Sequence, residues 1–194
     1  MDNLSSSYWC ERYNKKMTGW DLGEVSPPIK AYFDQVEDKS LKILIPGCGS
    51  GYEGAYLFTL GFHNVHLLDF ASQPLDEFKI QNPHFPSKNL HHEDFFKHEG
   101  KYDIIIEQTL FCAINTSLRK KYAEKMKDLL NSNGRVIGLL FNRDFPSGPP
   151  FGGSKKEYEF YFKPYFMSVV MEECYNSIEP RKGSELFIQL FKLS

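Results

Sequence analysis

The sequence predicts an α/β fold in which a mostly parallel sheet is covered by helices on both faces. An apolar run, Leu41-Lys-Ile-Leu-Ile45, leads directly into closely spaced glycines that end at Gly51, as expected for a buried strand, a tight turn and a helix. Apolar strand-like runs and helix-like segments then alternate along the chain. Two strand-like runs in succession close the chain, and they predict a hairpin that adds one antiparallel strand.

The expected elements follow in order after a polar extension over residues 1–25. Seven strands are expected, over residues 41–46, 64–69, 88–91, 102–107, 135–141, 166–174 and 185–193. Helices are expected over residues 26–36, 52–60, 74–81, 116–130 and 154–162. Ser72 is expected to cap the third of these helices, and Ser154 with Glu157 to form a capping box for the last. Residues 133–134 predict a turn. The result is a doubly wound seven-stranded sheet.

The glycine cluster and an acidic residue after the second strand predict a site for a nucleoside cofactor. Gly47, Gly49 and Gly51 carry no side chain that would block a ligand from reaching the backbone. Asp69 ends the second expected strand, where a carboxylate can accept hydrogen bonds from ribose hydroxyls. The Gly-x-Gly-x-Gly spacing suits S-adenosylmethionine at least as well as NAD. A plain tight turn for the glycines and a helix-capping role for Asp69 are the alternatives.

Composition and charge exclude several classes of protein. The chain has 194 residues and a formal net charge of −2, so it lacks the basic footprint of a nucleic-acid-binding protein. Its four cysteines include no Cys-x-x-Cys pair, which favours a reducing compartment and disfavours a zinc site. The first residues do not resemble a signal peptide, and no apolar run approaches the roughly 18 residues that cross a bilayer. We therefore expect one cytoplasmic domain that acts as a monomer, without a membrane or nucleic-acid partner.

Short motifs occur in a characteristic order along most of the chain. They are Thr18-Gly-Trp-Asp-Leu-Gly23, Ile45-Pro-Gly-Cys-Gly-Ser-Gly51, Leu68-Asp69, Glu93-Asp-Phe-Phe96, Glu107-Gln-Thr-Leu-Phe-Cys-Ala-Ile114, Gly148-Pro-Pro-Phe-Gly-Gly153 and Ser177-Ile-Glu-Pro-Arg-Lys-Gly183. Together they resemble the class I S-adenosylmethionine-dependent methyltransferases and, more narrowly, the thiopurine, thiol and halide methyltransferase family. The resemblance implies a single methyltransferase domain over residues 1–194, with a lid over residues 1–25 and a Rossmann-like core over residues 39–194.

The resemblance also implies a role for each matching position. The positions that match cofactor-binding residues are Trp9, Tyr13, Trp20, Gly47, Gly49, Gly51, Asp69, Asp94, Phe95 and Glu107. The three large aromatic residues would form the lid, the glycines would face the methionine and ribose, and Asp69 would hold the ribose hydroxyls. Asp94 and Phe95 would lie at the adenine. Glu107 and Gln108 would lie beside the sulfonium as catalytic residues that position the reactants.

The expected chemistry is methyl transfer from S-adenosylmethionine to a small thiol, such as a thiopurine, that reacts as its thiolate. An in-line displacement by an anion needs no metal, acid or base, so the protein contributes positioning and removal of water. No catalytic triad is evident in the sequence. A halide or hydrogen sulfide acceptor is the nearest alternative. An NAD(P)-dependent oxidoreductase and a non-catalytic cofactor-binding protein are alternatives from other classes.

Three further features are expected to have no catalytic role. The run His91-His-Glu-Asp94 with His98 matches no known spacing of metal ligands, so we expect loop polarity there and no metal site. Cys112 lacks an identifiable histidine partner in the sequence and is expected to be a small buried residue. Arg181 and Lys182 are expected to lie in a solvated hairpin turn.

Overall fold

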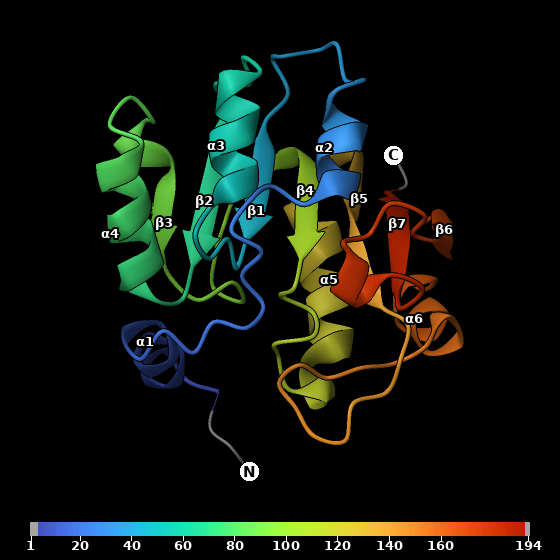
Figure 1. Ribbon diagram of the computed structural model, residues 1–194. Coiled ribbons are helices and arrows are strands. Elements are labelled where there is room, and N and C mark those ends of the chain that lie inside the picture. The colour runs from blue at the N-terminus through green and yellow to red at the C-terminus, as the bar shows by residue number, and fades with distance from the viewer. Residues whose placement is uncertain (1–3, 193–194) are drawn as a thin grey trace.

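The computed structural model describes residues 4–192, which form one seven-stranded sheet with helices on both faces (Figure 1). The strands are β1 (Ile43–Pro46), β2 (Val65–Asp69), β3 (Leu90–His92), β4 (Tyr102–Gln108), β5 (Leu130–Phe141), β6 (Ser168–Glu173) and β7 (Glu185–Phe191). They lie in the order β3-β2-β1-β4-β5-β7-β6. Only β7 runs antiparallel to its neighbours. The predicted fold class is confirmed.

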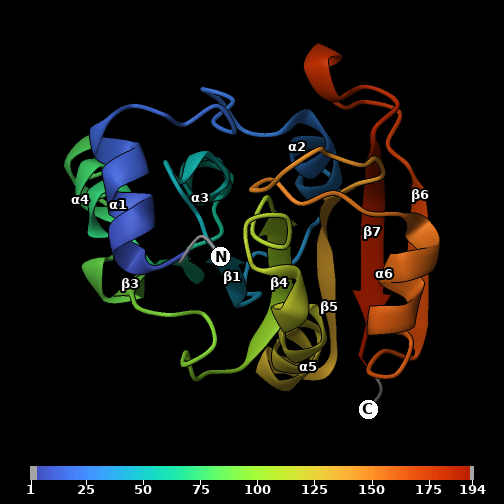
Figure 2. The same cartoon turned by 90° about the horizontal axis from the view of Figure 1, so that it is seen from below.

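Helices cover the sheet in two layers, as Figure 2 shows from below. The α-helices of the described chain are α1 (Ser6–Asn14), α2 (Pro27–Phe33), α3 (Tyr52–Thr59), α4 (Ser72–Gln81), α5 (Arg119–Leu129) and α6 (Lys155–Phe162). Residues of α2, α3 and α4 share one buried cluster, and residues of α5 and α6 share the other. Two clusters form because the central strands are apolar on both faces; all four residues of β1 are buried. Across residues 4–192, no helix combines the length and the hydrophobicity needed to cross a membrane.

Local sequence accounts for most element boundaries, with differences at two helices. Ser154 caps α6 as expected, and its hydroxyl accepts the backbone N–H of Glu157 at 3.4 Å. The reciprocal half of the capping box does not form, because the Glu157 carboxylate instead pairs with Arg119. Ser72 does not cap α4: Ala71 holds the cap position, and Ser72 is the first helical residue.

Two segments contain structure that was not predicted. No strand or long amphipathic helix is predicted in the polar extension, and a short helix of 9 residues, α1, forms there, with Ser5 as its side-chain cap. β5 begins at Leu130, before the predicted turn, because the pairing with β4 continues on both sides of a bulge. Asn133, in the bulge, has a φ of +62°, which asparagine tolerates better than most residues. The predicted turn is therefore absorbed into a longer strand.

The sheet order determines where a ligand can bind. β1 lies between β2 and β4, and the strand order reverses between β1 and β4. In open α/β sheets, ligands bind outside the carboxyl ends of the strands at such a reversal. In Figure 1 these ends point downward, and Figure 2 shows α1 and the loop over residues 142–153 beside them. Two segments that flank the core in sequence therefore approach the same edge of the sheet.

Candidate active site

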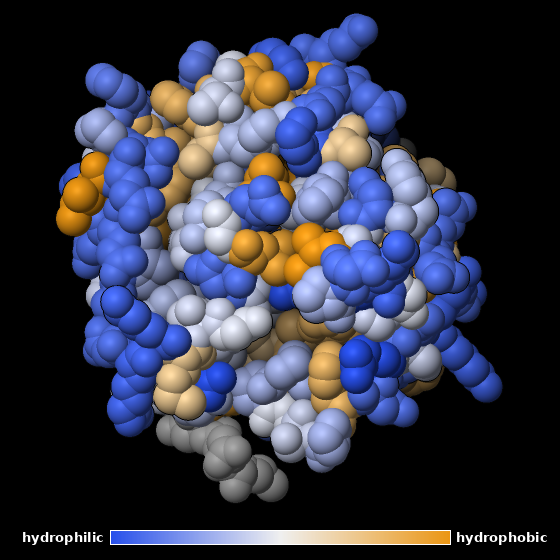
Figure 3. Space-filling view, in the orientation of Figure 1, coloured by the Kyte–Doolittle hydropathy of each residue, from blue (hydrophilic) through white to orange (hydrophobic). Residues whose placement is uncertain are grey.

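A cavity of about 930 Å³ lies at this edge, and Figure 3 shows the lower middle of the molecule hollowed, with hydrophobic residues in the hollow. The turn after β1 contributes Gly47, and the end of β2 contributes Asp69. The segment after β3 contributes Asp94 and Phe95. A smaller hollow of about 50 Å³ shares Gly47 with it and is lined by Gly49 and other residues of the turn. The sheet thus brings together residues that lie far apart in the sequence.

The predicted glycines have different neighbours in the turn. Gly49 has a φ of +51°, and a Cβ there would lie 3.2 Å from the Tyr13 hydroxyl, so the absent side chain leaves room for the extension. Gly51 caps α3 with a φ of +72°, and a Cβ there would lie 2.5 Å from the ring of Phe78 on α4. Gly51 lines neither the cavity nor the smaller hollow. Its lack of a side chain therefore permits close packing of α3 and α4, which differs from the expected opening toward a ligand.

Asp69 is held by the backbone at the end of β2. Its Oδ2 accepts the N–H of Gly49 at 2.9 Å, and its Oδ1 accepts the N–H of Ala71 at the same distance. Burial raises the pKa of Asp69, against the lowering effect of the backbone hydrogen bonds from Ala71 and Gly49. Each carboxylate oxygen keeps a second lone pair. The group is thus fixed in the cavity wall with acceptor capacity to spare.

The aromatic residues of the extension form a cluster over the cavity. Trp20 packs edge-to-face against Trp9 and Tyr13, with ring centroids 5.5 and 5.7 Å apart. All three rings line the cavity. Burial is the main effect that raises the pKa of Tyr13, and the nearby Asp69 carboxylate adds to it, so the phenol is neutral. The structure therefore gathers the three predicted lid residues on one side of the cavity.

Polar contacts attach the extension to the core at several places. Ser6 Oγ donates to the carbonyl oxygen of Phe70 at 2.8 Å, just after β2. Ser50 Oγ, in the glycine turn, donates to Asp21 at 2.6 Å. Arg181 donates to the carbonyl oxygen of Trp20 at 2.8 Å from the opposite side of the cavity. The extension therefore spans the cavity from β2 to the turn before β7.

The Glu107 side chain does not line the cavity, contrary to its predicted place beside the sulfonium. It is only 1% exposed, and Tyr122 on α5 donates a hydrogen bond to its Oε2. Its Oε1 accepts the N–H of Phe111 at 2.9 Å. Burial raises the pKa of Glu107 to about 7, although both hydrogen bonds favour the charged form. Glu107 thus fixes the loop after β4, whose residues Thr109 and Leu110 do line the cavity.

Gln108 lies at the smaller hollow. Its Oε1 is buried and has no hydrogen-bond partner within residues 4–192. A buried amide oxygen without a partner costs roughly 1–3 kcal/mol, so a donor from a ligand would be favoured there. Gln108 is therefore a better candidate than Glu107 for contact with a bound molecule.

Replacement of Glu107 by glutamine should change how stability depends on pH. Between pH 4.5 and about 7 the folded protein holds a proton on Glu107 that the unfolded chain has released. The free energy of unfolding of the wild type therefore falls as pH rises through this window, by up to about 3 kcal/mol from this group. The glutamine side chain of the Glu107→Gln variant is neutral at every pH. Relative to the wild type, the variant should therefore become more stable as pH rises from 5 to 8, and urea unfolding measures this difference.

The exposed Glu124, on α5, provides the control for this measurement. Glu124→Gln should reproduce the pH dependence of the wild type. Parallel stability curves for wild type and Glu107→Gln would show that the Glu107 carboxyl is not held protonated in the folded state.

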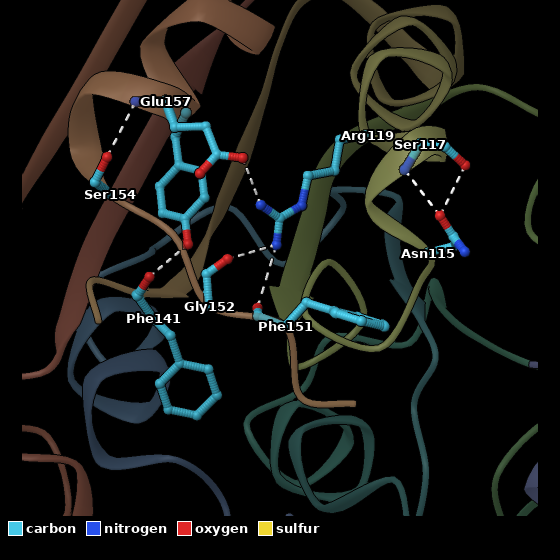
Figure 4. A network of polar contacts seen from close by, with 9 residues as sticks. Asn115, Ser117, Arg119, Phe141, Phe151, Gly152, Ser154 and Glu157 are labelled. Atoms are coloured by element: carbon cyan, nitrogen blue, oxygen red, sulfur yellow. Dashed lines mark hydrogen bonds and ion pairs between the residues drawn. The ribbon is translucent and has the colours of Figure 1, made fainter. Parts of the chain in front are cut away.

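The loop over residues 142–153 is tied down by the buried Arg119 at the start of α5 (Figure 4). The guanidinium donates to the carbonyl oxygens of Gly152 at 2.8 Å and Phe151 at 3.2 Å, and it pairs with Glu157 on α6 at 2.7 Å. Charge-assisted hydrogen bonds of this kind are about twice as strong as neutral ones. The anchor fixes the end of a loop whose Pro149 and Pro150 line the cavity.

Arg181 was expected in a solvated turn, and this prediction is wrong. The residue is 8% exposed, lines the cavity and lies 3.4 Å from Glu185 of β7. The turn folds back against the extension, and this tertiary contact buries the guanidinium. Arg143 also lines the cavity, with its guanidinium 4.9 Å from the ring of Phe145, and sequence reasoning missed it. The sequence marks these two arginines only by their position. Arg181 lies within a family motif, and Arg143 lies just before one.

Comparison with known proteins decides the family. Residues 4–190 match the family described as Thiopurine S-methyltransferase (TPMT). The chain belongs to this family. It is 31% identical over 192 residues to a probable thiol methyltransferase 2 of Arabidopsis thaliana, with 95% of this chain and 84% of that protein covered. It is 27% identical over 176 residues to a thiopurine S-methyltransferase of Vibrio campbellii, with 81% and 82% covered.

A solved structure shares the fold of this thiopurine methyltransferase family member. It is the crystal structure of Burkholderia thailandensis 1,6-didemethyltoxoflavin-N1-methyltransferase with bound 1,6-didemethyltoxoflavin and S-adenosylhomocysteine. The TM-score is 0.76 at 15% identity, with 97% of this chain and 87% of that chain covered. Family membership makes this chain an S-adenosylmethionine-dependent methyltransferase and decides against the NAD(P)-dependent oxidoreductase that the glycine motif left open.

Proposed function

We propose that this methyltransferase transfers a methyl group to a small organic thiol, which reacts as its thiolate. The main evidence for this proposal is the set of ionisable groups that line the cavity. Among the described residues that line it, the carboxylates are Asp69 and Asp94, and there is no histidine, lysine or glutamate. Asp69 is engaged by backbone N–H groups, and Asp94 accepts the N–H of Phe96 at 2.9 Å. A neutral acceptor would need a general base, whereas a thiolate arrives deprotonated.

Among the described residues three arginines line the cavity, Arg12 in the extension and two others whose positions suit an anionic acceptor. Arg143 and Arg181 place guanidinium groups in its wall, on the side of the loop over residues 142–153. Around them lie apolar side chains such as Phe145 and Pro149, which exclude water and strengthen attraction to an anion. A polarisable, weakly hydrated thiolate fits such a wall.

The opposite side of the cavity fits S-adenosylmethionine. Asp69 offers acceptors for the ribose hydroxyls, and in the adjoining smaller hollow the unpartnered Gln108 oxygen offers one for an ammonium group. Trp9, Tyr13 and Trp20 offer ring faces that favour a cation and apolar surface that excludes water. The cofactor supplies an electrophilic methyl group on a sulfonium. The protein holds the two reactants in line and keeps water out.

The volume of the cavity supports an organic acceptor over a single halide ion. Sites for one drug-sized ligand occupy roughly 300–1,000 Å³. This cavity, at about 930 Å³, lies near the top of that range, as expected of a site that holds a cofactor together with an organic acceptor. The names of its relatives include thiol, thiocyanate and thiopurine methyltransferases. We therefore place organic thiols first, with hydrosulfide, thiocyanate and iodide as smaller anions to compare.

The pH dependence of turnover provides the test. With S-adenosylmethionine and a panel of thiols, kcat/KM per total thiol should rise with pH and level off near the pKa of each acceptor, about 8.5 for an alkyl thiol. Aromatic thiols ionise more easily, so their plateau should begin at lower pH. Methylated product is measured by mass spectrometry.

Phenols and carboxylic acids of similar size serve as controls in the same assay, and they should be poor acceptors. Efficient methylation of a phenol or carboxylate, without product from any thiol or smaller anion, would contradict the proposal. A pH profile common to all thiols, whatever their pKa, would indicate that an enzyme group deprotonates the acceptor.

We also propose that the protein works as a monomer in the cytoplasm. The four cysteines, at positions 10, 48, 112 and 174, are all free thiols, which a reducing compartment preserves. Size-exclusion chromatography with light scattering and fractionation of the source cells would test the two statements separately.

A further inference from the structure

A cluster of histidines lies outside the cavity, at the edge of the sheet formed by β2 and β3. His66 comes from β2, His91 from β3, and His98 from the segment that follows. Glu93 completes the cluster. One possible ligand atom from each of His91, Glu93 and His98 lies within 4.8 Å of the other two. The cluster is not used by the proposed methyl transfer.

For neutral rings, the hydrogen bonds of the cluster set the position of the proton on His66 and His91. His66 Nε2 faces the amide oxygen of Asn64 at 3.2 Å, and an amide oxygen can only accept, so His66 Nε2 carries a proton. His66 Nδ1 is then an acceptor, and His91 Nε2, 2.9 Å away, donates to it.

This arrangement leaves Nδ1 of His91 as a lone pair that faces a carboxylate. The distance from His91 Nδ1 to Glu93 Oε1 is 3.9 Å, and the same oxygen lies 2.7 Å from His98 Nδ1. In the metal-free cluster His98 Nδ1–H donates to Glu93 Oε1 at 2.7 Å, and the Tyr102 hydroxyl can donate to His98 Nε2 at 2.7 Å. A metal at Nδ1 requires the ring proton to move to Nε2, which then donates to the Tyr102 hydroxyl. A lone pair beside a carboxylate is unfavourable unless a cation lies between them.

We propose that His91 Nδ1, Glu93 Oε1 and His98 Nδ1 bind a divalent transition-metal ion of the zinc type. Two imidazole nitrogens and a carboxylate oxygen suit zinc, cobalt or copper, whereas magnesium and calcium prefer oxygen ligands. Around a tetrahedral zinc with bonds of about 2.1 Å, ligand atoms lie about 3.4 Å apart. The distances of 2.7 and 3.9 Å need to change by less than 1 Å to reach this value, and the separation of the two histidine ligand atoms, within 4.8 Å, by no more than about 1.4 Å. Water completes the coordination.

The groups behind the ligands are those that a metal site needs. Ligating histidines usually donate their other ring N–H to an oxygen or a water, which fixes ring orientation. Here a ring nitrogen of His66 stands in for such an oxygen behind His91, and the Tyr102 hydroxyl would accept from His98 Nε2 once a metal occupied Nδ1. The spacing of these residues in the sequence does not indicate a metal site. His66 comes from another strand, and the chain must turn to bring His98 back to Glu93. The proposal replaces the sequence-based expectation of no metal.

The bound ion would tie together the short segment between Glu93 and His98. This segment carries Asp94 and Phe95, which line the cavity on its other side. His98 N–H already bonds to the carbonyl oxygen of Asp94 at 3.1 Å, so the segment is a single turn closed at both ends. A metal there would act on the structure of this turn and would not touch the reacting atoms.

Calorimetric titration of the chelator-treated full chain with zinc chloride tests the proposal. We expect saturable binding of one ion per chain, and visible absorption bands of four-coordinate cobalt when Co²⁺ replaces zinc. Glu93→Gln and His98→Gln should each weaken zinc binding by more than about tenfold, because loss of a ligand exceeds the usual effect of losing a supporting group. The unfolding temperature of the wild type should rise with zinc concentration.

His92→Gln is the matched control, because His92 neighbours His91 on β3 but lies outside the cluster. It should bind zinc as the wild type does. Circular dichroism establishes that each variant is folded, and Glu93, whose side chain is 39% exposed, tolerates replacement even if His98 does not. No saturable zinc binding by the wild type, or equal affinity in wild type and Glu93→Gln, would overturn the proposal.

Discussion

Deletion of residues 1–22 is expected to leave a folded core that binds S-adenosylhomocysteine at least about 100-fold more weakly. The three aromatic rings of the extension line the cavity, and loss of two contacts of hot-spot strength removes roughly 3–4 kcal/mol of binding free energy. The core should survive because α1 contains no buried residue. The polar contacts of the extension, such as Ser50 with Asp21, join groups that water can replace.

Calorimetric titration of the truncated and full-length chains measures this effect, with circular dichroism and thermal unfolding to establish that the core is folded. Trp20→Ala should reproduce much of the loss within the full chain. Met17→Ala is the matched control, because Met17 is 50% exposed in the same segment and does not line the cavity. If the truncated chain is folded and binds as tightly as the full chain, the aromatic residues only pack against the core.

Asp69→Ala should weaken binding of S-adenosylhomocysteine by roughly 1–3 kcal/mol, which is about 5- to 150-fold. The carboxylate lies in the cavity wall and is the proposed acceptor for the ribose hydroxyls. The substitution also removes the acceptor for the N–H groups of Gly49 and Ala71, so the glycine turn should loosen and the protein should lose some stability. Titration calorimetry measures affinity, and urea unfolding measures stability.

Asp103→Ala separates the two effects. Asp103 lies near the start of β4, where its carboxylate accepts the N–H of Lys42 and the side-chain amide of Asn131, away from the cavity. This variant should lose stability and keep the affinity of the wild type. An Asp69→Ala protein that binds S-adenosylhomocysteine as tightly as the wild type would show that Asp69 does not hold the ribose.

The sheet and most helices could be predicted because their signals are local. The aliphatic run before Pro46 reads as a strand in any context, and Ser154 caps α6 through a bond three residues away. α1 was missed because it buries no side chain completely, so it shows little of the apolar pattern that identifies a helix. Its position depends instead on contacts made after the core has formed.

Site residues could be predicted where a motif fixes them and not where packing does. Asp69 follows from its place at a strand end. Glu107 lies at an equivalent place, but α5 brings Tyr122 against it and the carboxyl turns away from the cavity. Arg181 is buried only because the extension, some 160 residues earlier, accepts its hydrogen bond. The partners of both residues lie far away in the sequence, and no local pattern reports them.

Because of the Arg119 anchor, the loop on the proposed acceptor side of the cavity can change its sequence and stay attached. Arg119 holds the main-chain oxygens of Phe151 and Gly152, so the grip does not depend on the side chains that the loop presents between residues 143 and 150. Doubling the length of a flexible loop costs only about 0.6 kcal/mol in closure entropy. A library of variants that differ in the identity and number of these residues therefore keeps the Arg119 anchor of the loop. It also leaves the glycine turn unchanged. On the proposed placement of the two reactants, evolution and protein engineering can exchange one acceptor for another here without rebuilding the half of the enzyme that would hold the methyl donor.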